Sequence, residues 1–249
     1  MDAPVRVTMA GAGNAFGDGG LLQSCVHVQP AGADGALLID CGASALSGLK
    51  RLGLDPGDVA VVAVSHLHGD HFGGLPYLIL DGQFSRRLRP LHLVGPPGLG
   101  ERLEQAMEVL FPGSTAVTRR FAVRVHEVAP GSRVEVEGCG VQAFEADHAA
   151  GAVALALRVE VGGRTIGYSG DSAWTDTLIE VADGADLFVC EAYTFDRPVR
   201  YHLHVPDLLA RLGELRCGRL LLTHAGPQVL ARRAELGLEL AEDGMVVEL

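Results

Sequence analysis

Basic residues are scarce in this sequence of 249 residues. It has 20 lysines and arginines against 31 aspartates and glutamates, which gives a net charge of −11. The long-range field of such a chain repels phosphate backbones unless a basic patch or bound metal ions reverse it locally. We therefore expect no nucleic-acid partner.

Cysteines are also few, and apolar runs are short. The five cysteines are odd in number and have no paired spacing, unlike a disulfide framework: Cys25, Cys41, Cys139, Cys190 and Cys217. Runs such as 59–64 are far shorter than the roughly 18 residues that a membrane-spanning helix needs. The first residues, from Met1 to Pro4, show no basic region followed by an apolar stretch. We expect reduced thiols, a cytoplasmic protein, no membrane association and no export signal.

The remaining composition is that of a globular protein. Hydrophobic residues make up 48% of the chain and charged residues 20%, which excludes disorder as the main state. No linker, repeat or low-complexity tract interrupts the sequence. We expect one domain spanning residues 1–249.

Short β-branched runs alternate with helical periodicity in the first half. They predict strands at 5–9, 25–28, 36–39, 59–64 and 91–94. Apolar residues at helical spacing predict helices over 44–52 and 100–110.

The middle of the chain shows strand patterns separated by turns alone. These runs predict an antiparallel meander over 123–128, 134–136, 141–144, 153–161 and 165–168. Strands at 187–189, 220–222 and 246–249 then alternate with helices over 175–181, 206–215 and 228–236. Two strand-rich blocks, each followed by helices, predict an α/β fold of two mixed sheets covered on the outside by helices.

The strongest local motif is Ser65-His66-Leu67-His68-Gly69-Asp70-His71, directly after the strand predicted at 59–64. Sites in open α/β sheets form just beyond the carboxyl ends of strands. A loop there can point His66 and His68 one way and Asp70 and His71 another, which predicts two metal positions. Imidazoles with a carboxylate suit zinc, or manganese or iron where more oxygen donors join. The alternative is a polar surface loop that happens to be rich in histidine.

Three further candidates stand at the ends of predicted strands: His148, Asp171 and His224. A single histidine near a strand end is more often a core or surface residue than a ligand. Together with the motif, however, the three supply a third ligand for each metal and a carboxylate that can bridge two cations.

In this order, the ligands resemble the two-metal pattern of the metallo-β-lactamase superfamily. Other segments agree, namely Gly11-x-Gly13-x-Ala15, Leu38-Ile39-Asp40-Cys41-Gly42, Phe72-Gly73-Gly74-Leu75-Pro76, Gly170-Asp171-Ser172 and Leu222-Thr223-His224. Within the superfamily, the chain is similar to the ribonuclease Z-like phosphodiesterase branch. That branch uses a Glu-Ala-x-Thr segment and a following histidine, here Glu191-Ala192-Tyr193-Thr194 and His202. The resemblance covers essentially the whole chain and implies a four-layer αββα sandwich.

The resemblance also implies the roles of the ligands. The first metal would be held by His66, His68 and His148, the second by Asp70, His71 and His224, with Asp171 bridging them. Zinc is the expected metal and manganese the second choice. Two such cations activate water and polarise the scissile oxygen.

Two catalytic roles follow from the same resemblance. Asp70 would also orient the attacking water, and His202 would stabilise developing negative charge or protonate the leaving oxygen. His204 is an alternative to His202, because either side chain could face the metals. In a lactonase-like mechanism, Tyr193 or Tyr201 would be the donor.

Several neighbouring residues have a second interpretation. Asp40 is a candidate acceptor for the N–H of a ligand imidazole, or it has a turn or capping role. Cys41 and Cys190 are expected to be buried structural thiols. The basic run 86–89 is either a solvated loop or a subsite for a small phosphate. The histidines inside predicted strands are expected to be structural: His27, His92 and His126.

The function predicted from these residues is metal-dependent hydrolysis of a small-molecule substrate, a phosphodiester or cyclic phosphate. Transfer-RNA processing enzymes of the ribonuclease Z type carry a protruding arm between the ligands corresponding to His148 and Asp171. These residues are only 23 positions apart here, and predicted strands fill the interval. His68 and the chain length argue against the flavodiiron oxidoreductases. Lactone or thioester hydrolysis is the alternative, and a non-catalytic metal-binding sensor or scaffold is the alternative from another class.

A homodimer is implied by the resemblance to the phosphodiesterase branch. It would be favoured if the apolar segment 72–80 were partly exposed. The same segment is also consistent with a buried helix.

Overall fold

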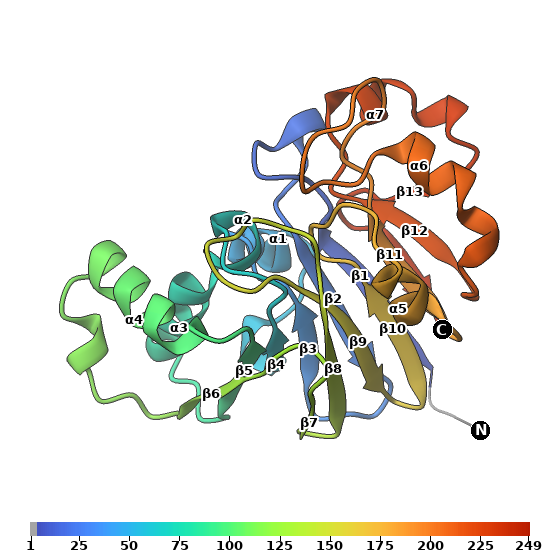
Figure 1. Cartoon of the computed structure of the whole chain (residues 1–249). Coiled ribbons are helices and arrows are strands. Elements are labelled where there is room, and N and C mark those ends of the chain that lie inside the picture. Colours follow the sequence, from blue (N-terminus) through green and yellow to red (C-terminus); the bar gives the residue numbers. More distant parts are fainter. Residues whose placement is uncertain (1–3) are drawn as a thin grey trace.

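Strands from both predicted blocks form two seven-stranded mixed sheets in the computed structural model, which describes residues 4–249 (Figure 1). The strand order is β14-β1-β2-β3-β4-β5-β6 in the first sheet and β13-β12-β11-β10-β9-β8-β7 in the second. Residues 1–3, which contribute to the expectation about an export signal, lie outside the described residues.

The first sheet combines the N-terminal strands with the last strand of the chain. Its strands are β1 (Val5–Gly11), β2 (Cys25–Pro30), β3 (Ala36–Ile39), β4 (Val59–Ala63), β5 (Leu91–Gly95), β6 (Val123–Glu127) and β14 (Val246–Glu248). Pairing is antiparallel from β14 through β1 and β2 to β3, and parallel from β3 to β6.

The second sheet contains the antiparallel meander followed by parallel strands. Its strands are β7 (Arg133–Val136), β8 (Cys139–Glu145), β9 (Leu155–Val161), β10 (Arg164–Tyr168), β11 (Leu187–Glu191), β12 (Leu220–Thr223) and β13 (Glu239–Leu240). Pairing is antiparallel from β7 to β10 and parallel from β10 to β13. Consequently β8, β10, β11 and β12 all end at the same edge of this sheet.

Helices cover the outer face of each sheet, so the predicted four-layer αββα arrangement is confirmed (Figure 1). On the first sheet these are α1 (Ala45–Arg51), α3 (Leu75–Phe84) and α4 (Leu99–Leu110), with the short α2 (Gly69–Phe72) at the sheet edge. On the second sheet they are α5 (Thr177–Ala182), α6 (Val205–Ala210) and α7 (Pro227–Ala231).

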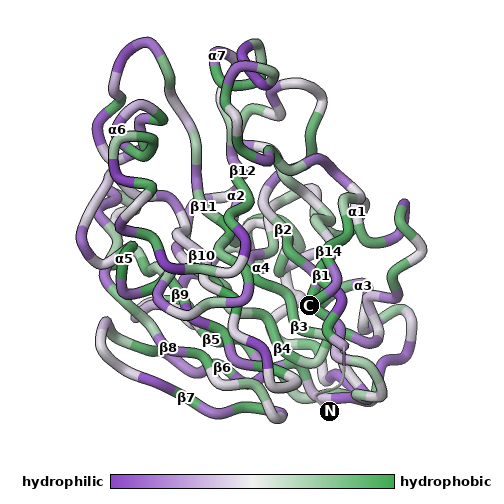
Figure 2. The backbone as a smooth tube through the Cα atoms, turned by 90° about the vertical axis from the view of Figure 1, so that its right-hand side faces the viewer, coloured by the Kyte–Doolittle hydropathy of each residue, from purple (hydrophilic) through white to green (hydrophobic). Residues whose placement is uncertain are grey.

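Three apolar layers hold the sandwich together. Alternate strand residues such as Val7, Ile39, Val141 and Leu221 fill the space between the two sheets. The opposite faces of the strands pack under the helices in two further clusters. Figure 2 shows the hydrophobic stretches along strands such as β4 and β12. Each fully buried aliphatic side chain contributes about 1.5–3 kcal/mol, so this core fixes the strand ends on which the site depends.

Three predictions of local structure need correction. Residues 123–127 do not open the meander: as β6 they pair in parallel with β5 at the edge of the first sheet. The reason is that α4 connects β5 to β6, and a strand-helix-strand connection returns the chain in parallel. The helices predicted over 206–215 and 228–236 end early, at Ala210 and Ala231, and continue as short 3₁₀ turns.

The segment 72–80 is mostly buried and consists of the end of α2, a two-residue turn and the first part of α3. Within it Leu75, Leu78 and Ile79 are buried, and only Tyr77 is exposed among its large apolar residues. The exposure that would have favoured a dimer is therefore limited to Tyr77 and, in part, Leu80, and the homodimer stays a prediction.

Two further features bear on the sequence predictions. Among the residues described, none of the helices combines the length and hydropathy that crossing a membrane requires. All five cysteines have free thiols, and Cys41 and Cys190 are buried. Burial raises the pKa of the Cys41 thiol to about 12, as befits an inert structural residue.

Candidate metal centre

The candidate site lies where strand ends of both sheets meet. The histidine-rich loop follows β4 of the first sheet and continues into α2. His148, Asp171 and His224 follow β8, β10 and β12 of the second sheet. The parallel orientation of these three strands brings their carboxyl ends to one edge. With the loop after β4, this edge brings together ligands that are up to 158 positions apart in the sequence, His66 and His224.

Local backbone features fit this convergence. Asp40 and His224 adopt positive φ values of 60° and 56°, which cost a residue other than glycine about 1 kcal/mol or more. Gly170, directly before Asp171, has φ of 57°, and a Cβ there would lie 2.7 Å from the carbonyl oxygen of Leu155. At Gly42, a Cβ would lie 2.2 Å from the carbonyl oxygen of Asp70, so glycine lets the metal loop approach the end of β3.

The histidines and carboxylates form three groups of potential ligands. The first group consists of His66, His68 and His148, with potential ligand atoms within 4.8 Å of one another. The second consists of Asp70, His71, Asp171 and His224, within the same distance limit. The third consists of Asp171, Glu191, His202 and His224 and shares Asp171 and His224 with the second. All seven residues predicted from the sequence are therefore brought together, and the loop is not a polar surface loop, because His66 and His71 are fully buried.

The carboxylate of Asp171 lies between the first two groups. Its Oδ2 is 3.9 Å from Nε2 of His66 and 3.9 Å from Nε2 of His148. Its Oδ1 is 3.2 Å from Nε2 of His71 and 3.5 Å from Nε2 of His224. One oxygen thus faces each of these two groups, which is the arrangement of a bridging carboxylate.

Contacts behind the ligands fix the orientation of their rings. Asp40 accepts a hydrogen bond from Nδ1 of His71 at 2.6 Å, and it also accepts from the Ser65 backbone and hydroxyl. Nδ1 of His148 donates to the carbonyl oxygen of Tyr201 at 2.9 Å. These bonds leave the Nε2 atoms of both rings facing Asp171. Of the two roles predicted for Asp40, the structure therefore shows that of an acceptor for the N–H of a ligand imidazole.

A buried glutamate orients His202. Glu191 at the end of β11 is fully buried, and its Oε1 accepts from Nδ1 of His202 at 2.5 Å. Its Oε2 accepts from the backbone N–H of Leu203 and of Ser172. His202 Nδ1 is also 3.9 Å from Oδ2 of Asp171. Glu191 appeared in the sequence only as part of the Glu-Ala-x-Thr segment, and its contact with His202 depends on a loop path that no local pattern predicts.

His204 does not face the site. Its Nε2 contacts the carbonyl oxygen of Phe195 at 2.8 Å, and its Nδ1 contacts Asp207 at 3.2 Å. Both ring nitrogens are therefore engaged at the start of α6. Of the two candidates, His202 is the one that lines the site.

The facing charges set the protonation of the site. Burial acts to raise the pKa of Asp171, but the positive charges of His224 and His71 hold it well below its ordinary value. Burial acts to lower the pKa of His224, but Asp171 and Asp70 raise it to about 10. Burial lowers the pKa of His66 well below its ordinary value, and repulsion from the positive charge of His71 lowers it further. Burial also acts to lower the pKa of His202, but the hydrogen bond to Glu191 outweighs it and the pKa is raised.

These residues fit a pair of divalent cations. Nε2 of His66 and Oδ1 of Asp171 are buried, and neither forms a hydrogen bond. Leaving such atoms unpaired costs about 1–3 kcal/mol each unless another partner is present. Five imidazoles and two carboxylates are nitrogen and oxygen donors typical of transition metals. The buried clusters are consistent with a dinuclear metal site, and binding would release the protons carried by His71 and His224.

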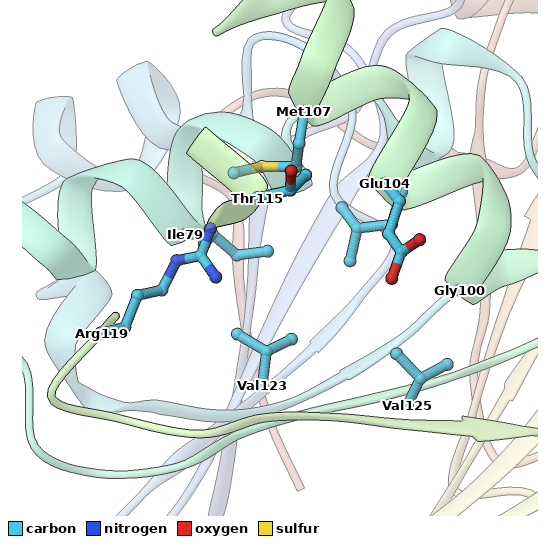
Figure 3. A pocket seen from close by; sticks show the side chains of 9 residues that line it. Ile79, Gly100, Glu104, Met107, Thr115, Arg119, Val123 and Val125 are labelled. Carbon is cyan, nitrogen blue, oxygen red and sulfur yellow. The ribbon is translucent and has the colours of Figure 1, made fainter. Parts of the chain in front are cut away.

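A cavity of about 210 Å³ opens over this centre. Its lining residues are Ala15, Phe16, His68, Asp70, Asp171, Tyr193, His202 and His224. Another cavity of about 210 Å³ lies between α3, α4 and β6 (Figure 3). Its lining combines apolar side chains such as Leu103 and Val123 with the charged Glu104 and Arg119, and it holds none of the predicted ligands.

The remaining predictions concern residues outside the centre. His92 and His126 contact each other, with Nδ1 and Nε2 3.0 Å apart, and His27 is buried in β2. In the basic run 86–89, Arg87 is neither a solvated side chain nor part of a phosphate subsite. Its buried guanidinium donates to the carbonyl oxygens of Pro56, Val59 and Pro90, and thus ties the loop to the start of β4.

Fold and site together define a metal-dependent hydrolase. The chain belongs to the beta-lactamase superfamily: the family described as "Beta-lactamase superfamily domain" matches residues 36–225. Within it, the chain belongs to the ribonuclease Z-like branch. It is 25% identical over 246 residues to the ribonuclease Z of Mycobacterium bovis BCG, with 90% of this chain and 87% of that protein covered.

Solved structures show the same fold over the whole chain. Human tRNase Z, short form, is 26% identical with a TM-score of 0.78, covering 97% of this chain and 98% of that one. The metallo-beta-lactamase fold protein YhfI from Bacillus subtilis has a TM-score of 0.79 at 22% identity, with 99% and 100% covered. A diphosphatase from the PhnP family has a TM-score of 0.76 at 19% identity, with 98% of each chain covered.

Proposed function

We propose that this protein hydrolyses a small phosphodiester or cyclic phosphate with two divalent metal ions, zinc ahead of manganese. The observation that carries the proposal is the position of Asp171, whose two oxygens face separate imidazole groups beneath a cavity that His202 also lines. When bound, such ions polarise the phosphoryl oxygens and lower the pKa of the attacking water.

The ligand assignment follows the first two groups. His66, His68 and His148 would hold one ion, Asp70, His71 and His224 the other, and Asp171 both. The preference for zinc rests on the five imidazole nitrogens, because manganese favours a larger share of oxygen donors.

His202 and Asp70 have the positions required for moving protons. Because Nδ1 of His202 donates to Glu191, its Nε2 is the atom free to donate a proton to the leaving oxygen. Asp70 lines the cavity with Oδ2 3.2 Å from Nε2 of His224, and its carboxylate can accept a hydrogen bond from the attacking water. Glu191 keeps the His202 ring from rotating and so preserves the direction of the donor.

Two observations favour a small substrate over transfer RNA. The interval between His148 and Asp171 consists of a loop followed by β9 and β10, which are paired strands of the second sheet. The net charge of −11 opposes the approach of a polyanion. The ribonuclease Z relatives therefore support the chemistry of phosphodiester cleavage rather than the RNA substrate.

A substrate panel tests this proposal. Metal-loaded protein is assayed with bis(p-nitrophenyl) phosphate, a cyclic nucleotide, a lactone, a thioester and a precursor transfer RNA. We expect kcat/KM for a phosphodiester to exceed that for the lactone and the thioester by at least about tenfold, and activity to disappear with a chelator.

Other results of the panel would overturn the proposal. Preferred hydrolysis of the lactone or thioester would assign the protein to ester chemistry. Preferred cleavage of the precursor RNA would restore the transfer-RNA function, and no turnover of any substrate with both metals bound would favour a sensor or scaffold.

A further inference from the structure

The loop between β1 and β2 places an exposed phenyl ring beside the metal centre. The ring of Phe16 is 80% exposed, and it lines the cavity over Asp171. Tyr193 lines the same cavity, with its ring centre 4.5 Å from that of His202. Two aromatic rings therefore line a cavity in which the other side chains are mostly charged or ionisable.

A second hollow of about 360 Å³ adjoins this cavity, and Ala15 and Phe16 line both. The other lining residues of the hollow are uncharged: Gly17, Leu21, Leu22, Gln23, Ala43 and Ser44. A phosphate or carboxylate in this hollow would find no cationic partner among the lining side chains. An uncharged group of the substrate is therefore the group that fits there.

Hydrogen bonds anchor the backbone of the loop around Phe16. Oδ1 of the buried Asn14 accepts from the Phe16 backbone N–H at 3.0 Å, and Nδ2 of Asn14 donates to the carbonyl oxygen of Ala225 at 3.0 Å. Ala225 directly follows His224, so this side chain links the loop to the metal centre. Nε2 of Gln23 donates to the carbonyl oxygen of Ala15 at 3.1 Å. A ring on an anchored backbone loses little conformational entropy when a ligand packs on it.

We propose that Phe16 and the adjoining hollow form a subsite for an uncharged flat ring on one ester of the substrate's phosphate. The ring stacks on Phe16 while the phosphate lies over Asp171. This inference rests on the proposed function and names the substrate class within it: phosphodiesters that carry an aromatic or heteroaromatic substituent, such as a nucleoside or an aryl group.

Exposure alone does not distinguish Phe16. Phe84, at the end of α3, is 77% exposed, and it lines a hollow with Leu110 and Phe111 rather than the cavity of the metal centre. What distinguishes Phe16 is its place between the metal centre and an uncharged hollow. Phe84 is therefore a matched control, with the same side chain and nearly the same exposure.

Calorimetric titration of zinc-loaded protein tests the subsite without turnover. The probes are methyl phosphate, phenyl phosphate and cyclohexyl phosphate. We expect phenyl phosphate to bind at least about tenfold more tightly than methyl phosphate, with cyclohexyl phosphate between them, because a flat ring stacks better than a puckered one. Phe16→Ala should reduce the phenyl-to-methyl ratio to less than about threefold, whereas Phe16→Trp and the control Phe84→Ala should preserve it.

The outcomes separate the subsite from the proposed function. The subsite is wrong if phenyl phosphate does not bind more tightly than methyl phosphate, if Phe16→Ala preserves the ratio, or if cyclohexyl phosphate binds as well as phenyl phosphate. The proposed function is judged by diester turnover instead. Ring-dependent binding without hydrolysis of any diester would retain the subsite and reject the phosphodiesterase.

Discussion

Two cavities of about 210 Å³ lie in this molecule, and the chemistry of their walls separates them. The cavity at the strand ends is lined by three histidines and two aspartates whose ligand atoms converge. The cavity between α3, α4 and β6 has Leu103, Met107 and Val123 as its walls, and the side chains of Glu104 and Arg119 at separate places on its boundary (Figure 3).

The difference shows that concave shape alone does not indicate function. At the strand ends, the charged side chains are buried and carry a large desolvation cost. The hydrogen bonds from His71 to Asp40 and from His202 to Glu191 offset only part of this cost. The unpaired atoms of His66 and Asp171 point to a cationic partner. The cavity between α3, α4 and β6 has no such set of converging ligand atoms, and its buried walls Leu103 and Met107 contribute packing contacts.

Asp171→Ala should give the largest effect. Removing the carboxylate that faces both imidazole groups should lower kcat/KM for the best substrate by at least about 10³-fold, because it removes a ligand from both metal positions. Steady-state kinetics with bis(p-nitrophenyl) phosphate measures this loss. Asp147→Ala is the control, since Asp147 is exposed and should stay within about twofold of the parent. Parent-like activity of Asp171→Ala would end the distinction between the cavities.

His202→Ala should follow, with kcat lowered about 10²–10³-fold and KM changed much less. The reason is that His202 is expected to act on the leaving oxygen and not to hold a metal. Metal content by elemental analysis should equal that of the parent. His204→Ala is the matched control, and its kcat should change less than about threefold because both of its ring nitrogens face away from the cavity. The reverse pattern would move the catalytic role by two residues.

Leu103→Ala tests the cavity between α3, α4 and β6. Enlarging it should lower the free energy of unfolding by about 2–4 kcal/mol, because Leu103 is 5% exposed and packs under the first sheet. Urea denaturation measures this change, and Leu110→Ala on the same helix should cost less than about 1 kcal/mol, since Leu110 is exposed. Metal content and kcat should stay at parental values in both variants. Loss of metal from Leu103→Ala would contradict the separation of the two regions.

His27→Gln should produce the smallest change at neutral pH and a larger one in acid. Burial lowers the pKa of His27 to about 4, against a weaker opposing effect of Asp58. As the pH falls from about 6.5 to 4, the unfolded chain takes up a proton on this residue and the folded chain does not. The parent therefore loses about 3 kcal/mol of stability from this group over that range.

The measurement for His27 is the difference between parent and variant in urea unfolding at pH 7 and pH 4. Groups of the metal centre titrate in both proteins and cancel in the comparison. An unchanged difference between the two pH values would show that His27 is protonated in the folded state.

The sequence predicted the site better than the path of the chain around it. The apolar run of β4 followed by His66-x-His68-x-Asp70-His71 is a local pattern, and strand ends placed His148, Asp171 and His224 beside it. The choice between His202 and His204 depended instead on the loop after β11, where Glu191 captures one ring. Likewise β6 joined the first sheet because of the crossover through α4, and Arg87 was buried by carbonyl groups distant in sequence. Such contacts are tertiary, and no residue spacing encodes them.

Elemental analysis of metal content tests whether Asp171 bridges two metal positions. Protein purified without chelator is saturated with zinc, freed of excess metal and analysed beside Asp171→Ala and His71→Ala. We expect two ions per chain in the parent, one in His71→Ala and weakened occupancy of both positions in Asp171→Ala. One ion or none in the saturated parent would rule out a dinuclear site bridged by Asp171.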